Sequence, residues 1–82
     1  MNITVGTVVR SKAGKDKGAF LAVIGTSGDR VLVADGKSRK VENPKPKNPA
    51  HLAPTKTVFE LPLTNKELKR RLKEFAAVTK ED

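Results

Sequence analysis

The chain has 82 residues, no cysteine and a formal net charge of +8, from 17 Lys and Arg against 9 Asp and Glu. A chain of this length forms one domain with a modest core, and the lack of cysteine excludes a disulfide scaffold and any thiolate metal site. The longest apolar run, residues 19–24, is far too short to cross a bilayer and the first residues lack a signal-peptide pattern, so we expect a cytoplasmic protein.

Two strands are predicted first along the chain, over residues 5–13 and 19–25. Both segments are dense in the β-branched and apolar residues that favour strands. The second is apolar on both faces, which predicts a central position in a sheet. Between them, the loop at 13–18 carries two glycines, which supply the positive φ angles of a tight reversal.

A hairpin is predicted next, with residues 30–34 and 37–41 as its arms. Asp35-Gly36 lies between them, and a two-residue Asp-Gly loop favours a type I′ turn. The second arm is polar, which predicts an edge strand. Four short strands with closely spaced turns fit a small antiparallel β-barrel better than a βαβ fold.

Residues 43–54 contain four prolines, which predict an extended polyproline II segment lying across the barrel. Within it, His51 has two interpretations: its ring satisfies a backbone group that the prolines leave without a partner, or it has a functional role. A fifth strand is predicted over 55–61, closing the sheet.

A C-terminal helix is predicted over residues 64–78. Thr64 and Glu67 have the spacing of a capping box, in which each residue bonds the backbone amide of the other. The apolar residues at i, i+4, i+7 and i+8 form one stripe; they are Leu68, Leu72, Phe75 and Ala76. The helix is predicted to pack on the barrel through Leu68, Leu72 and Phe75. The predicted organisation is therefore a barrel over 1–60, including 43–54, a helix over 64–78 and a frayed tail over 79–82.

Catalysis is not expected. The chain has one histidine, its acidic residues lie mostly beside basic ones, and its glycines form no phosphate-binding or dinucleotide fingerprint. We therefore predict no enzyme activity, no cofactor, no metal and no small-molecule substrate. A membrane partner is not expected either, because the amphipathic helix needs its apolar face for the core.

The positive charge favours a nucleic-acid partner, although an acidic protein surface or solubility alone are alternatives. The loop at 13–18 is either an ordinary turn with solvated lysines or a turn that lets phosphates approach the backbone, against which Asp16 argues. The basic helix residues at i, i+3, i+4 and i+7 form either a polyanion-binding face or a solvated one. Lys45 and Lys47 extend the positive surface.

The candidate RNA-binding residues come from the two loops and the helix. They are Lys12, Lys15, Lys17, Lys37, Arg39, Lys40, Lys66, Lys69, Arg70 and Lys73. The chain has no Tyr or Trp, and its three Phe are predicted in the core. Single-strand binders stack bases on exposed aromatic rings, so this composition favours structured RNA held by its phosphates and riboses. Four arginines remain available for stacking or bidentate contacts: Arg10, Arg39, Arg70 and Arg71.

Residues 5–18, followed by apolar 20–24, resemble a KOW motif, although Ser11 stands where many KOW motifs carry an apolar residue. Residues 34–37, 41–47 and 48–52 are similar to the eukaryotic- and archaeal-type large-subunit ribosomal protein 14 family, whose bacterial relatives are small stand-alone KOW proteins. The similarity spans about residues 4–58. The resemblance implies an SH3-like barrel, RNA binding and association with ribosomes.

The expected function is accordingly binding to structured RNA, ribosomal RNA above all, as a ribosome-associated protein that also meets ribosomal proteins. The alternative is a KOW protein-interaction module that docks on the transcription or translation machinery.

Overall fold

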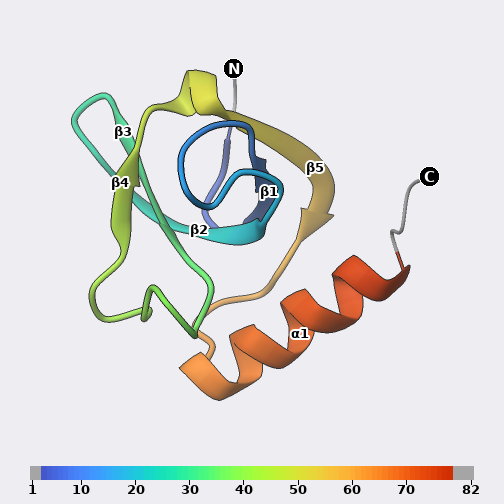
Figure 1. Ribbon diagram of the computed structural model, residues 1–82. Coiled ribbons are helices and arrows are strands. Elements are labelled where there is room, and N and C mark those ends of the chain that lie inside the picture. The colour runs from blue at the N-terminus through green and yellow to red at the C-terminus, as the bar shows by residue number, and fades with distance from the viewer. Residues whose placement is uncertain (1–2, 79–82) are drawn as a thin grey trace.

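The computed structural model describes residues 3–78 and contains a five-stranded sheet and one α-helix (Figure 1). The predicted tail over 79–82 lies outside the described residues. The elements in chain order are β1 (Thr7–Ser11), β2 (Phe20–Ser27), β3 (Arg30–Ala34), β4 (Lys45–Lys47), a 3₁₀ turn η1 (Pro49–His51), β5 (Leu52–Val58) and α1 (Asn65–Val78).

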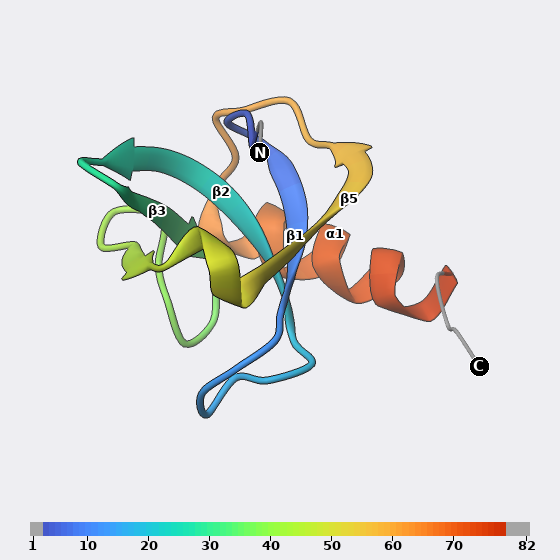
Figure 2. The same cartoon turned by 90° about the horizontal axis from the view of Figure 1, so that it is seen from above.

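The sheet has the order β4-β3-β2-β1-β5, and every neighbouring pair is antiparallel. The predicted central position of β2 is confirmed. The sheet is strongly curled (Figures 1 and 2), but no ladder joins the edge strands β4 and β5 within residues 3–78. The mainly-β class with one helix is confirmed, while the predicted fifth strand does not close the sheet.

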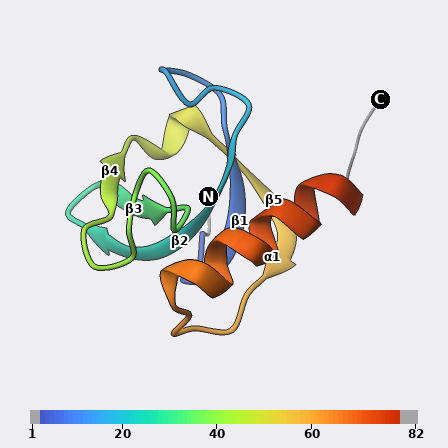
Figure 3. The ribbon, with the colours of Figure 1, turned by 60° about the horizontal axis from the view of Figure 1, so that its bottom comes forward.

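The inner strands bury side chains on both faces, because successive residues of a strand point to opposite sides. Val9 lies in the cluster enclosed by the curl of the sheet, with Leu21 and Leu52. Its neighbour Val8 lies in the second cluster, on the outer face, together with Leu68 of the helix. Figure 3 shows α1 crossing this outer face. The domain therefore has two small cores that share one sheet.

The helix begins with the predicted capping box. The Glu67 amide donates to Thr64 Oγ1 at 3.1 Å, and the Thr64 amide donates to Glu67 Oε1 at 3.0 Å. Leu68 and Leu72 are buried, and the Phe75 ring meets the Phe20 ring edge to face, with centroids 5.0 Å apart. The predicted packing of the helix on the sheet is confirmed.

The predicted Asp35-Gly36 hairpin is wrong. Asp35 Oδ1 accepts hydrogen bonds from the amides of Lys37 and Arg39, each at 2.8 Å, so the chain folds into a compact loop after β3. Residues 37–41 form no strand, and β3 pairs with β4. The two-residue hairpin lies instead at Gly28-Asp29, where Ser27 of β2 faces Arg30 of β3.

The proline-rich segment is also more structured than predicted. It contains β4, η1 and the start of β5, and Pro46 is accommodated because β4 is an edge strand. β5 pairs with β1 and lies over Leu52–Val58 rather than 55–61. His51 is exposed, and its ring makes no hydrogen bond within residues 3–78, so of its two interpretations the one in which the ring satisfies a backbone group does not hold. Its carbonyl instead accepts from the Lys12 amide at 2.8 Å.

Candidate functional site

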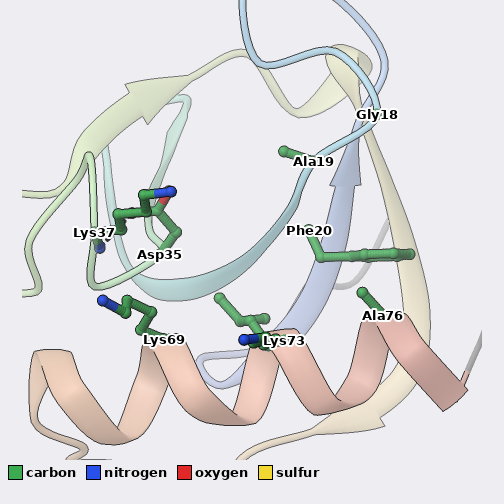
Figure 4. Close-up of a pocket in the computed structure, with 9 residues that line it drawn as sticks. Gly18, Ala19, Phe20, Asp35, Lys37, Lys69, Lys73 and Ala76 are labelled. Carbon is green, nitrogen blue, oxygen red and sulfur yellow. Dashed lines mark hydrogen bonds between the residues drawn. The ribbon is translucent and has the colours of Figure 1, made fainter.

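A hollow of about 580 Å³ lies between α1 and the loops at one end of the sheet. Lys69 and Lys73 of the helix line it together with Lys37 of the loop after β3. Figure 4 shows these lysines around the space below Gly18 and Ala19. Part of its wall is apolar and includes Phe20, Leu72 and Ala76. The structure thus brings Lys37 together with Lys69 and Lys73, from which it is separated by more than thirty residues of sequence.

Two further hollows adjoin this one and add more positive charge. A hollow of about 330 Å³ shares Ala19 and Asp35 with it, and another of about 520 Å³ shares Gly18. We call the three together the basic groove. The basic residues that line it are Arg10, Lys12, Lys15, Lys17, Lys37, Arg39, Lys45, Lys69 and Lys73.

Seven of the ten candidate residues line the basic groove. They are Lys12, Lys15, Lys17, Lys37, Arg39, Lys69 and Lys73. Lys40, Lys66 and Arg70 are exposed but line none of the three hollows. At about 100° per residue, Lys69 and Lys73 lie beside the buried stripe of α1, whereas Lys66 and Arg70 lie further round the helix. The predicted basic stripe is therefore divided between the groove and the open surface.

The β1–β2 loop is held by a buried ion pair. Lys47 Nζ lies 2.9 Å from Asp16 Oδ1, from Ser11 Oγ and from the Ala13 carbonyl oxygen. The side chains of Lys47 and Asp16 are 8% and 25% exposed. Burial raises the pKa of Asp16, but hydrogen bonds from Lys47 and Ser11 and the charge of Lys47 outweigh it, so the net pKa is lowered. Asp16 is therefore an ionised carboxylate neutralised within the fold.

Because of this ion pair, Asp16 no longer argues against the binding of phosphate by the loop at 13–18. A free carboxylate there would repel phosphate, whereas one paired with an ammonium at 2.9 Å has little net field. It also accounts for Ser11, a buried polar residue of β1, because the hydroxyl accepts from Lys47 and lies 2.9 Å from Asp16 Oδ1. The sequence gives no signal for this contact, since Lys47 lies 31 residues from Asp16.

Asn65 fixes the loop after β3 to the start of α1. Its Oδ1 accepts from the Val41 amide at 2.7 Å, and its Nδ2 donates to Glu42 Oε1 at 2.8 Å. The bond from Asn65 lowers the pKa of Glu42. Gly36 also lies directly against the Asn65 carbonyl group. These contacts place Lys37 beside the helix, and no local pattern in the sequence predicts them, because Asn65 lies 24 residues from Val41 and 23 from Glu42.

The aromatic rings are partly buried and are contacted by other side chains of the chain. The Arg10 guanidinium carbon lies 6.0 Å from the centroid of Phe20, and that of Arg71 lies 5.9 Å from the centroid of Phe59. Phe75 packs on Phe20. The prediction that the three Phe belong to the core is confirmed by their packing on the outer-face cluster.

No group of three or more His, Cys, Asp or Glu side chains in the described chain could hold a metal ion. Over residues 3–78, no helix is long and apolar enough to span a membrane. The chain matches no protein-family model, and no curated protein is similar enough to count as a match.

Proposed function

We propose that the protein binds structured RNA, ribosomal RNA in particular, through the basic groove, as a ribosome-associated protein. We also propose that its curled sheet is a variant of the SH3-like KOW fold. One observation carries the first proposal: basic side chains from the β1–β2 loop, the loop after β3 and α1 line one continuous series of hollows. Binding of RNA by its phosphates needs cations clustered on one surface, and the groove clusters nine basic residues.

The groove suits phosphates better than stacked bases. Seven of its nine basic residues are lysines, which act as point charges toward phosphate. Asp16, which lies at its wall, is neutralised by Lys47. The partly buried Phe rings offer little free aromatic surface. Recognition by shape and backbone, rather than by base stacking, follows from this chemistry.

The test is the salt dependence of affinity for a structured RNA hairpin, measured by fluorescence anisotropy. If five groove cations contact phosphates of a duplex, log K should fall against log salt with a slope of about −4 to −5. A slope near zero contradicts the electrostatic mode.

Matched variants locate the contacts. Replacing Lys37, Lys69 and Lys73 together by Gln should reduce the slope by about 2 to 3. The control replaces Lys56, Lys66 and Arg70 by Gln, which removes the same charge from exposed positions outside the groove. If both triple variants lose equal affinity, the groove is not the binding site.

A second candidate function is favoured by one observation. An apolar hollow of about 430 Å³ is lined by Val5, Ile24, Val41 and the segment 61–63, and Val5 is 51% exposed. Such a surface suits a protein partner in the transcription or translation machinery, a ribosomal protein for example. That function predicts saturable protein binding that Val5→Asp abolishes and that the Gln variants of the groove leave intact.

A further inference from the structure

Asp35 is, with Asp16, one of two acidic residues that line the basic groove. It lines both the hollow beside α1 and its neighbour. The amides of Lys37 and Arg39 both donate to its Oδ1, which fixes the orientation of the carboxylate. Its Oδ2 accepts no hydrogen bond, and the carboxylate forms no salt bridge, within the described part of the chain.

A fixed carboxylate is the wrong group for a surface that binds only phosphates, because like charges repel at close range. It is the right group to accept a hydrogen bond from a neutral donor. Phe20 and Ala76 line the opposite end of the hollow from Asp35, with Lys69 and Lys73 along its helix side (Figure 4). Leu72 adds to this apolar wall. The hollow therefore has an apolar wall, a free carboxylate oxygen and two ammonium groups. These suit, in that order, the apolar face, the hydrogen-bond donor and the phosphate of one ligand.

A single nucleotide has these three parts. The volume of about 580 Å³ lies in the range of small-molecule sites, which is about 300–1,000 Å³. The amino groups of cytosine, adenine and guanine are donors on the base. Uracil has no amino group, and its carbonyl oxygens flank its one N–H and would be repelled by a carboxylate.

We propose that this hollow holds one unpaired nucleotide of the bound RNA, and that Asp35 selects a base with an exocyclic amino group. The base lies against Leu72 and Ala76 and donates its amino proton to Asp35 Oδ2, while Lys69 and Lys73 meet the flanking phosphates. The proposal rests on the proposed RNA binding and deepens it by naming the feature of the RNA that is recognised.

The experiment uses three RNA hairpins of one sequence: fully paired, with a single bulged C, and with a single bulged U. Affinities for the full chain are measured by fluorescence anisotropy at one salt concentration. The C bulge should bind roughly tenfold or more tightly than the U bulge, the ratio expected for one hydrogen bond to a charged group. It should also bind more tightly than the paired hairpin.

The Asp35→Asn variant tests the role of the carboxylate. Its amide oxygen can still accept from Lys37 and Arg39, while its NH₂ group replaces the free acceptor by a donor. The preference should therefore reverse toward the U bulge. The loss of negative charge strengthens binding to all three RNAs alike and cancels in the ratio of affinities. Asp29→Asn is the control, because it makes the same charge change at a 99% exposed side chain in the β2–β3 turn.

The outcomes separate the two proposals. If all three hairpins bind wild-type protein equally, or if Asp35→Asn leaves the C/U ratio unchanged, the nucleotide site is wrong and RNA binding through the groove stands. If Asp29→Asn shifts the ratio as much as Asp35→Asn, Asp35 is not the selecting residue. If no hairpin binds, the proposed function fails and this site fails with it.

Discussion

Replacing Lys47 by Met removes the ammonium that joins β4 to the β1–β2 loop and keeps an unbranched side chain of similar length. In the native protein this ammonium bonds Asp16, Ser11 and the Ala13 carbonyl, each at 2.9 Å. The variant leaves Asp16 with only the Ser11 hydroxyl as a side-chain partner. We expect a loss of stability rather than a local rearrangement, because the side chain is 8% exposed.

The magnitude follows from the burial of the pair. Removing one member of a fully buried ion pair costs about 3–5 kcal/mol. Since the Asp16 side chain is 25% exposed, water can solvate part of the stranded charge, and we expect about 2–3 kcal/mol. In a domain of this size, 1 kcal/mol corresponds to about 4–8 °C, so Tm should fall by about 10–20 °C.

The assay is thermal and urea unfolding followed by circular dichroism, with Lys45→Met as the control. Lys45 lies on the same strand, and its side chain makes no hydrogen bond within residues 3–78, so its substitution should change the free energy of unfolding by less than about 0.5 kcal/mol. Equal effects of the two substitutions would refute the argument. The double variant Lys47→Met/Asp16→Leu should regain part of the loss, because no unpaired charge remains buried.

Three further predictions concern the cap, the loop after β3 and acid stability. Thr64→Ala should cost about 0.5–2 kcal/mol in urea unfolding through loss of the N-cap; an unchanged midpoint would mean that the cap is dispensable. Gly36→Ala should cost about 2 kcal/mol or more, since Gly36 has φ +79° and a Cβ there would collide with the Asn65 carbonyl. Gly28→Ala, at φ +62° in open space, should cost only about 1–2 kcal/mol of backbone strain, and equal losses would exclude the contact with the helix. Because the pKa of Asp16 lies below its ordinary 3.8, its stabilisation is complete above that pH and is lost as pH falls through the folded value. Stability of Asp16→Asn should therefore fall less than that of wild type between about pH 4.5 and 2, and parallel pH curves would contradict this.

The parts of the fold that were predicted from the sequence depend on local signals. The capping box of Thr64 and Glu67 specifies the start of α1 within a single turn, and the apolar period specifies its packed face. The all-apolar run in β2 specifies a strand buried on both sides, hence central. Each of these signals lies within a few residues of the structure that it determines.

The wrong predictions depend on partners far away in the sequence. Asp35-Gly36 has the local pattern of a two-residue hairpin, but Gly36 packs against Asn65 and β3 takes β4 as its partner. Pro46 argued against a strand, yet an edge position tolerates it. In the site, the sequence left open whether the basic residues of the loops and of the helix form one surface, and only the docking of α1 brings Lys37 together with Lys69 and Lys73. Asp35 was predicted as a turn residue, so its place inside the groove was missed.

The two edge strands of the sheet, β4 and β5, affect whether the protein aggregates at high concentration. A free strand edge can recruit another chain by backbone pairing. Here β4 is three residues long with Pro46 at its centre, and β5 carries Pro54 near its middle and the exposed Lys56 beyond it. Each proline removes an amide donor, and a second molecule would bring another excess of positive charge to the same place. We therefore expect that the sheet, although it is not closed, does not pair edge to edge with the sheets of other molecules to form ordered aggregates.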